Sequence, residues 1–586
     1  MYTFADIYIL KYNNNMKKAS FALAAILCGL FSIISCSSPN VGERSTGIIP
    51  APVSQTVSEG LFVIKPNTEI GYSDESLKGL AQMLSEEIES VSGMKLASAS
   101  CKESNCIIFL ELTSPDEFAD MPKSYGLSPK DGDPADERYS LSIQKENIYI
   151  KAPAPEGIYR GITSLKQIVG SNSEPIDGKI YLPLMEVKDS PRYAWRGLSF
   201  DVSRCFFDVD EAKQVIDMAA LYKMNVLHMH LSDNQGWRIE IKKHPKLTEV
   251  GGNLPLNGRK VGFYTQEQFK DLVNYANERY ITIIPEVDLP GHTAAVFAAY
   301  PEFKNAVHFK TKVNIPGQAF NALDVDDPKA MQFTEDVIAE LSALAPGSYI
   351  HIGGDEAVGL PHDKFIRYVN AAREMVKKNG KKMVGWQETA RAGIGEGDVI
   401  QHWIHMKQSL ESTIDNKRDI PENMREAMKL FVEFMKEAPK DPGLGVSKGA
   451  KVILSPSSYV YLDIPYKEMS IDSTQNADRE RLGLVAYGRQ GIDEMYNWDP
   501  MTFNPTVEDP VKDVAGVEAA IWCETIENAS DLQFLLMPRL AGVAEKGWSI
   551  VDKTNWDEYK VRLGAHSPIW EKMNWNYFKS SMVDWK

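Results

Sequence analysis

Two adjacent acids, Asp355 and Glu356, follow two glycines in the run HIGGDE at 351–356. Neighbouring side chains in a strand point to opposite faces, so both carboxyls reach one pocket only if the chain turns ahead of them. Glycine permits such a turn because it adopts backbone conformations that other residues avoid. Two carboxyls held together cannot ionise independently, which separates an acid from a base. Since Asp355 alone is equally explained as a helix N-cap, the pair needs support from elsewhere in the chain.

Polar and aromatic residues recur where other short apolar runs end. Asp233 closes one such run, and His292 follows another. Tyr461 and Asp463 stand two positions apart, so they share a face at the end of a strand. A single aromatic residue of this kind more often fills a core, but three tryptophans at strand ends are harder to explain in that way. The further candidates are Arg204, Trp386, Trp403, Trp522 and Glu524.

Eight strand-like runs position these residues. Amphipathic segments, such as 210–222 and 266–279, lie between most of the runs, although the fifth and sixth are too close for a full helix. Eight strand–helix units with chemistry at the strand ends predict a (β/α)8 TIM barrel over residues 189–586, with its active site at the carboxyl ends of the strands. Segments 407–449 and 465–513 are long enough to be insertions over that site. The runs are 195–203, 225–233, 281–288, 348–356, 382–388, 398–404, 451–463 and 517–524.

A small α+β domain is predicted before the barrel, over residues 58–188. It gathers no acids, bases or metal ligands, so we interpret it as a support. Its strand-like runs are 61–64, 106–112, 139–143 and 147–151, and its helical patterns are 73–91 and 157–169.

Length and charge limit the function classes. A chain of 586 residues exceeds one compact core, so two or more domains are expected. The formal net charge of -16 argues against a nucleic-acid partner, which favours a basic face. Eleven tryptophans suit the stacking of sugar rings, although tryptophan also fills cores.

The N-terminal 36 residues have the pattern of a lipoprotein signal peptide. Met16 is the expected start, and a basic pair and an apolar run at 19–34 follow it. That run is short for a membrane span. The residues before Cys36 resemble a lipobox, whose cysteine is lipidated; an ordinary signal peptide with an incidental cysteine is the alternative. We expect a cell-envelope protein that is anchored to the outer membrane only through its lipid, with a linker at 37–57.

Four cysteines remain beyond the signal peptide. Cys101 and Cys106 are spaced to close a small disulfide loop, although free thiols are an equal alternative. Cys205 and Cys523 lie at the ends of the first and last barrel strands, which are neighbours in a closed barrel, so a disulfide there also stays open. No spacing among the four fits a metal site.

Nine motifs follow one another in the order found in a known family. They are WRGLSFDVSR at 195–204, HMHLSDNQGWR at 228–238, EVDLPGH at 286–292 and HIGGDE at 351–356, followed by GWQE, QHW, YLD, YNWDP and WCE. With these motifs the chain resembles the β-N-acetylhexosaminidases of glycoside hydrolase family 20, in a bacterial lipoprotein form. The resemblance covers all eight strands and the small domain. It implies a glycan substrate, exo-acting release of terminal GlcNAc or GalNAc with retention of configuration, no cofactor and no metal ion.

The matching motifs imply a role for each candidate. Glu356 would be the general acid and then the general base, while Asp355 would orient the substrate's acetamide and stabilise the charge formed as its oxygen attacks C1. Asp233 and His292 would form a relay to Glu356. The remaining residues would contact the glycan: Tyr461 at the acetamide carbonyl, Trp386, Trp403 and Trp522 as walls, Arg204, Asp463 and Glu524 at hydroxyls, and Trp498 under the next sugar.

Two other functions stay open. A metal-dependent barrel hydrolase would use His228 and His230, which share a strand face, and a chelator would abolish its activity. A non-catalytic glycan-binding lipoprotein would use the aromatic pocket but has no need of the acid pair. Met229, Asn234 and Cys205 depart from the family pattern, which bears on sugar contacts and pH dependence. The natural glycan, the choice between GlcNAc and GalNAc, and the oligomeric state are not readable from the sequence.

Overall fold

The computed structural model describes residues 44–98, 106–130, 132–254, 258–305, 322–357, 360–405 and 436–586. The expected signal peptide, with Met16 and Cys36, lies outside them. Among the helices within these ranges, none combines the length and the apolar character that crossing a bilayer requires.

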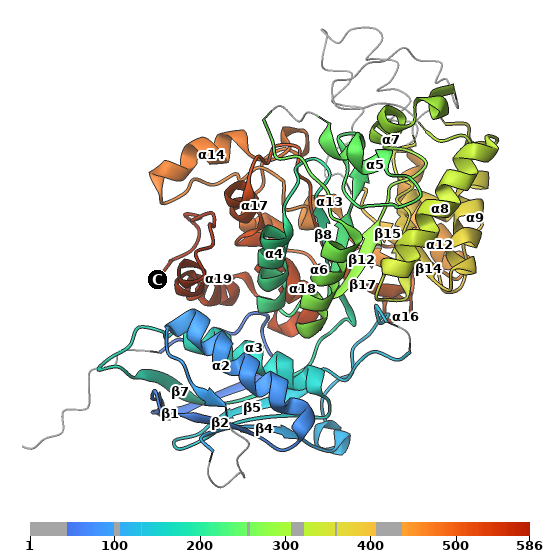
Figure 1. Cartoon of the computed structure of the whole chain (residues 1–586). Coiled ribbons are helices and arrows are strands. Elements are labelled where there is room, and N and C mark those ends of the chain that lie inside the picture. Colours follow the sequence, from blue (N-terminus) through green and yellow to red (C-terminus); the bar gives the residue numbers. More distant parts are fainter. Residues whose placement is uncertain are drawn as a thin grey trace, which may run out of the picture. The chain divides into compact units, whose positions relative to one another are not determined.

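Eight parallel strands close into a barrel, which confirms the predicted fold class (Figure 1). The strands are buried almost throughout because helices cover their outer faces and side chains fill the interior, so they appear in the sequence as apolar runs. In chain order they are β8 (Trp195–Asp201), β9 (Val226–His230), β12 (Thr282–Glu286), β13 (Tyr349–His351), β14 (Lys382–Trp386), β15 (Val399–His402), β16 (Lys451–Leu454) and β17 (Val514–Ile521).

Helices surround the barrel close to their predicted positions. Side chains fix where they begin: Asp208 and Thr265 each cap a helix, and the third helical residue returns the hydrogen bond. Between β14 and β15 the described chain forms only the short turn η6 (Gln387–Arg391), in keeping with the predicted lack of a full helix. The main helices are α4 (Val209–Leu221), α6 (Gln266–Glu278), α8 (Pro328–Leu344), α9 (His362–Lys378), α12 (Asp441–Ser447), α17 (Ala529–Leu536), α18 (Arg539–Trp548), α19 (Trp556–Gly564) and α20 (Ser567–Lys572).

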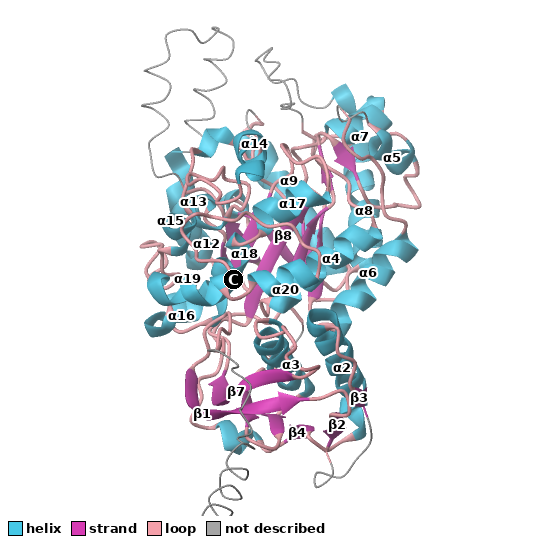
Figure 2. Cartoon of the chain, turned by 90° about the vertical axis from the view of Figure 1, so that its left-hand side faces the viewer, coloured by secondary structure: helices cyan, strands magenta, loops and turns pink. Residues whose placement is uncertain are grey.

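The small domain is a mixed seven-stranded sheet with two helices on one face (Figure 2). The helices are α2 (Lys78–Ser92) and α3 (Pro155–Gly170), whose apolar sides face the sheet. In sheet order the strands are β1 (Ser54–Ile64), β7 (Ile180–Asp189), β5 (Tyr139–Ile143), β6 (Ile148–Ala152), β4 (Ile108–Leu112), β2 (Glu69–Tyr72) and β3 (Ala97–Ser98).

The second half of the predicted linker at 37–57 is instead built into the small domain. Ile48 and Ile49 are fully buried. Ile49 N donates to Gln167 Oε1 at 3.0 Å, and Gln167 Nε2 donates to Ile49 O at 2.5 Å. A buried side-chain amide therefore satisfies backbone that has no regular partner. The sequence of this segment resembles a linker because it shows no strand periodicity before Ser54, where β1 begins.

The cysteines separate into two cases. Cys106 is disulfide-bonded, and its predicted partner Cys101 lies outside the described residues. Cys205 and Cys523 are buried free thiols, so the disulfide left open between β8 and β17 is not formed.

A loop of the small domain closes the amino-terminal end of the barrel. Leu127 packs against a cluster of inward-facing residues at that end, which includes Trp195 and Val226. Leu127 N donates to Ala515 O at 3.1 Å. Gly126, with φ +90°, makes this approach possible, because a Cβ there would lie 1.9 Å from Ala515 O. The two domains therefore share one core at the base of the barrel.

We expect Gly126→Ala to lower the free energy of unfolding more than Gly132→Ala. Gly132 has nearly the same φ, +91°, but its Cβ would meet nothing within 4 Å. Both variants carry the backbone strain, and only the first adds the clash, which costs about 1–3 kcal/mol more. Thermal unfolding of the full chain measures the difference. Equal midpoints in the two variants would show that this loop does not seal the barrel.

Candidate active site

The turn after β13 brings the acid pair together at the mouth of the barrel. Gly353 and Gly354 have φ of +73° and +93°, and Glu356 itself has φ +43°. A Cβ on Gly353 would lie 1.9 Å from Asp288 Oδ1, and Gly354 N donates to that oxygen at 3.0 Å. The turn therefore packs directly against Asp288 and is hydrogen-bonded to it. The strained backbone at Glu356 is typical of a functional position.

Both acids converge on one imidazole. His292 Nε2 lies 3.8 Å from Asp355 Oδ2 and 3.6 Å from Glu356 Oε2. Burial, with the charges of Asp288 and Glu356, raises the pKa of Asp355 well above its usual value, although His292 opposes this. Burial also raises the pKa of Glu356, against the lowering effects of His292 and Arg204. A glutamate that keeps its proton at higher pH than usual is suited to act as an acid.

Asp233 holds His292 from behind. His292 Nδ1 lies 3.2 Å from Asp233 Oδ1, and Arg204 Nη2 lies 2.6 Å from Asp233 Oδ2. Although burial opposes the charge of Asp233, Arg204 and His292 lower its pKa well below the usual value. The pKa of His292 is raised well above its usual value, because Asp233, Asp288 and Asp355 outweigh the effect of burial. The pair is therefore a carboxylate and an imidazolium.

Four aromatic rings form a connected wall beside the acids. Trp386 lies 5.8 Å from Trp522, and Tyr461 lies 6.0 Å from Trp522 and 6.5 Å from Trp403, measured between ring centroids. Hydrogen bonds fix two of the indoles: Trp386 Nε1 donates to Glu286 Oε1 at 2.8 Å, and Trp403 Nε1 donates to a glutamate oxygen at 3.1 Å. Such a wall presents apolar faces and excludes water.

Two further carboxyls, Asp463 and Glu524, lie near each other, and Glu524 lies near Arg204. Arg204 Nη2 is 3.9 Å from Glu524 Oε1, and Asp463 Oδ1 accepts from Trp522 N at 3.4 Å. Burial raises the pKa of both acids. Asp463 Oδ2, Glu524 Oε2 and Asp355 Oδ1 are buried without a hydrogen-bond partner in the described chain. Buried acceptors of this kind call for donors, which sugar hydroxyls and an amide N–H supply.

Trp498 belongs to a separate aromatic group. It stacks on Tyr459, with ring centroids 5.6 Å apart and an interplanar angle of 21°, and it meets Phe503 edge-on. Within the described chain it makes no ring contact with the four-ring wall. The described structure therefore places Trp498 in an aromatic group separate from the four-ring wall.

Three residues that sequence reasoning gave no role are part of the site. Burial raises the pKa of Asp288 to about 6, and Asp288 is hydrogen-bonded to Asp355. Glu388 is fully buried and accepts from Trp403. Tyr487 meets Tyr461 edge-on, with ring centroids 5.8 Å apart. Burial and the charges of Asp463, Glu524 and Glu356 raise the pKa of its hydroxyl well above the usual value. The first two stand within the EVDLPGH and GWQE motifs, whereas Tyr487 comes from an insertion and carried no signal.

The histidines of the metal-dependent alternative face carboxylates. His228 lies 2.9 Å from both Glu286 and Glu518, and His230 lies 2.6 Å from Glu286 and 3.2 Å from Asp233. His228 and His230 each belong to one set of three residues whose ligand atoms are near enough to share an ion, and Asp288, His292 and Asp355 form a third set. Because both nitrogens of each ring are engaged by a carboxylate, the arrangement fits an ion-pair network better than an open metal site.

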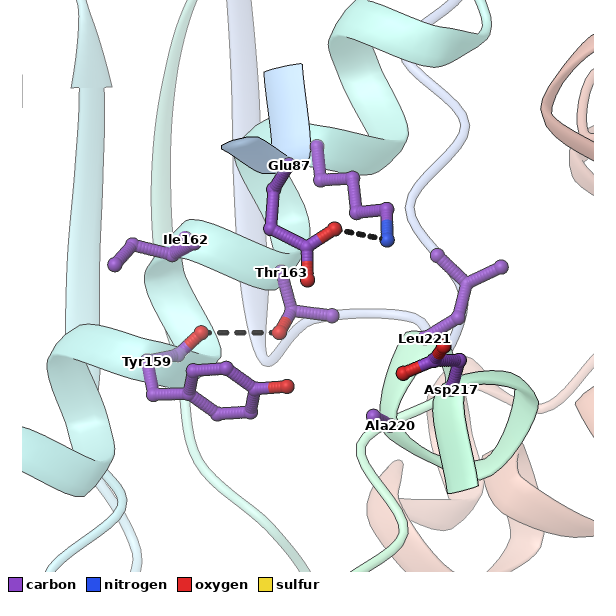
Figure 3. Close-up of a pocket in the computed structure, with 8 residues that line it drawn as sticks. Glu87, Tyr159, Ile162, Thr163, Asp217, Ala220 and Leu221 are labelled. Carbon is purple, nitrogen blue, oxygen red and sulfur yellow. Dashed lines mark hydrogen bonds and ion pairs between the residues drawn. The ribbon is translucent and has the colours of Figure 1, made fainter. Parts of the chain in front are cut away.

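A cavity far from these residues in the fold lies between α2, α3 and α4 (Figure 3). Glu87, Tyr159, Thr163 and Asp217 line it, together with Lys166, which forms an ion pair with Glu87. None of the predicted site residues is among its lining residues, so it does not compete with the barrel mouth.

Known proteins are similar to this chain in both sequence and fold. Residues 193–550 match the glycosyl hydrolase family 20 catalytic domain, and residues 45–190 match domain 2 of that family. A Cellulomonas fimi protein named beta-N-acetylhexosaminidase is 36% identical over 454 residues, 77% of this chain and 82% of that protein. The beta-hexosaminidase of Porphyromonas gingivalis is 28% identical over 94% of this chain and 67% of its own length.

Solved structures of the same family have a similar fold. The N-acetyl-beta-hexosaminidase of Streptomyces plicatus, solved in complex with Thio-NAglucal, has a TM-score of 0.74 and 33% identity, and the match covers 92% of this chain and 98% of that one. The Streptomyces coelicolor beta-N-acetylhexosaminidase has the same TM-score and identity and is covered completely, with 93% of this chain. The chain is therefore a glycoside hydrolase that belongs to glycosyl hydrolase family 20.

Proposed function

We propose that the protein is an exo-acting β-N-acetylhexosaminidase that hydrolyses terminal N-acetylhexosamines with retention, using the substrate's acetamide as nucleophile. The observation that carries the proposal is the convergence of Asp355 and Glu356 on His292 beside an aromatic wall. The names of the similar proteins support the sugar class.

Glu356 is suited to protonate the glycosidic oxygen. Its raised pKa keeps the proton available, and His292 stabilises the carboxylate that remains after transfer. The same carboxylate then accepts a proton from the attacking water, because the second step reverses the first. Asp233 keeps His292 charged and oriented through both steps.

The acetamide supplies the nucleophile. Most retaining glycosidases place a second carboxylate across the sugar, about 5 Å from the acid, and substrate-assisted enzymes are an exception. Asp355 is instead the direct neighbour of Glu356, and its free Oδ1 can accept the acetamide N–H. Its negative charge then stabilises the oxazolinium as the carbonyl oxygen attacks C1. An attached nucleophile has a high effective concentration, so the protein only needs to orient it.

The terminal position of the sugar follows from the hydroxyl contacts. Arg204, Asp463 and Glu524 form a group at the mouth, in which two buried carboxylate oxygens have no partner in the described chain. A terminal sugar whose own hydroxyls donate to these oxygens satisfies them, and this supports the proposal of exo action. We propose that Trp498 stacks on the sugar at the other side of the cleaved bond.

A thiazoline that mimics the oxazolinium should inhibit the enzyme competitively when it hydrolyses 4-nitrophenyl N-acetyl-β-glucosaminide. Asp355→Asn should weaken that inhibition about tenfold or more, because the negative neighbour of the ring is lost. Asp363→Asn, a change at an exposed acid of α9, is the control. Hydrolysis that the thiazoline does not inhibit would exclude acetamide participation.

Asp288→Asn should shift the acid limb of kcat/KM to lower pH by about one unit. Asp355 must be ionised to act, and the charge of Asp288 raises its pKa, so activity falls as the pH drops through that raised pKa. Asparagine removes the charge and keeps an oxygen for Gly354 N. The pH profile from pH 3 to 8 measures the shift, and a limb that stays in place or rises would contradict the assignment.

We also propose that the protein is lipidated at Cys36 and acts in the cell envelope, which rests on the lipobox-like sequence. Growth with radioactive palmitate should label the wild-type chain in the membrane fraction and should leave Cys36→Ser unlabelled. Equal labelling of the two would show that Cys36 is not the lipidated residue.

A further inference from the structure

A line of alternating carboxylates and imidazoles continues from the relay into the interior of the barrel. We call it the acid–imidazole column. Every member is at most 1% exposed, although acids and histidines usually avoid such positions. In order from the interior to the relay, the column consists of Glu518, His228, Glu286, His230 and Asp233.

His230 is the link between the interior and the relay. Its Nδ1 lies 2.6 Å from Glu286 Oε2, and its Nε2 lies 3.2 Å from Asp233 Oδ2. When both carboxylates are ionised they only accept hydrogen bonds, so the two contacts are satisfied together only if both nitrogens of His230 donate and the ring is an imidazolium. Arg204 Nη1, which can also only donate, lies farther from Nε2, at 3.5 Å. Neither contact can be exchanged for water, because the ring is 1% exposed.

Charged side chains face His230 from each of the segments that pack against it. Glu286 and Asp288 approach from β12 and the segment after it, Asp201 and Arg204 come from the end of β8, and Asp233 lies in its own segment. Burial lowers the pKa of His230, but the facing carboxylates outweigh this and raise it well above the usual value. The balance of charge around the ring thus agrees with the two hydrogen bonds.

We propose that His230 is a positioning residue for the general acid: its Nε2–H fixes the carboxylate of Asp233, which in turn fixes His292 beside Glu356. The proposal deepens, and rests on, the function proposed above. Asp233 receives Arg204 at 2.6 Å and His292 at 3.2 Å as well as His230. Asn234 N also donates to Asp233 Oδ1. Without the His230 donor, Arg204 is the cation closest to Oδ2, and we expect the carboxylate to shift toward it and away from His292.

Two substitutions of His230 test the hydrogen bonds of its two ring nitrogens one at a time. The amide nitrogen of asparagine occupies the position of Nδ1, one bond beyond Cγ, and that of glutamine occupies the position of Nε2. His230→Gln therefore keeps a donor toward Asp233 and loses the one toward Glu286, whereas His230→Asn does the reverse. Both remove the same charge from the same buried site, so a purely structural role predicts similar losses in both.

The readout is the dependence of kcat/KM on the leaving group. A 2,4-dinitrophenyl leaving group departs without a proton, while a phenyl leaving group needs the acid. For His230→Asn we expect kcat/KM for the phenyl glycoside of GlcNAc to fall at least about tenfold more than for the dinitrophenyl glycoside, and for His230→Gln we expect both to fall by one common factor. Glu356→Gln is the reference, with a difference of about 10²–10⁴ between the substrates.

His228→Gln is the matched control, since His228 is equally buried and touches Glu286 but has no contact with Asp233. We expect His228→Gln to lower kcat/KM for the phenyl and the dinitrophenyl glycosides by the same factor. Equal losses for both substrates in His230→Asn, or a larger leaving-group effect in His230→Gln, would overturn the proposal. A wild-type enzyme that hydrolyses neither glycoside would instead overturn the proposed function.

A measurement on the unmodified protein covers the case in which the variants do not fold. Nitrogen-15 spectra of the histidine-labelled full chain should show an imidazolium, assigned to His230 as distinct from His228 and His292, that keeps both ring protons from pH 5 to 8. A neutral ring at this position within that range would overturn the proposal, because it cannot donate to Glu286 and Asp233 together.

Discussion

A carboxylate can be buried inside this barrel only where positive charge or hydrogen-bond donors face it, and the site is arranged by that constraint. Asp233 is faced by Arg204 and two imidazoles, and its pKa falls. Asp355 and Glu356 share one imidazole between them, and their pKa values rise. One residue type thus supplies a fixed negative charge behind the site, at Asp233, and acids at its mouth whose raised pKa values let them take up or release a proton. The number of donors that reach each carboxyl decides which it becomes.

The barrel was predictable from the sequence because its strands are buried on both faces and therefore appear as apolar runs. The small domain was less so. The first half of β1 is an exposed, polar strand, and β7 showed no pattern that had been singled out, although both pair over nearly their full length. The burial of residues 45–51 depends on side chains that are distant in the sequence, among them Gln167, Asn172 and Glu545. Contacts of this kind leave no periodicity in the local sequence.

The candidate site divides in the same way. Asp355 and Glu356 were recognisable because the double glycine signals a turn, and the motifs placed the aromatic wall and the relay. Asp288 was hidden because its role depends on packing against Gly353, which only the folded turn creates. Tyr487 reaches the mouth from the insertion at 465–513 but stands outside its YNWDP motif. Sequence patterns thus identify the groups that do chemistry, while the groups that tune them are set by tertiary contacts.

The unpaired acceptors at the mouth explain why a sugar, and not merely an apolar ring, fits this pocket. Asp355 Oδ1, Asp463 Oδ2 and Glu524 Oε2 are buried beside indoles that offer them no hydrogen. A ligand without donors would leave each of these oxygens unsatisfied, at a cost of about 1–3 kcal/mol apiece. A 2-acetamido sugar brings one amide N–H and several hydroxyls on a single rigid ring. Selection for the sugar therefore results as much from the penalty on ligands without donors as from attraction to the walls.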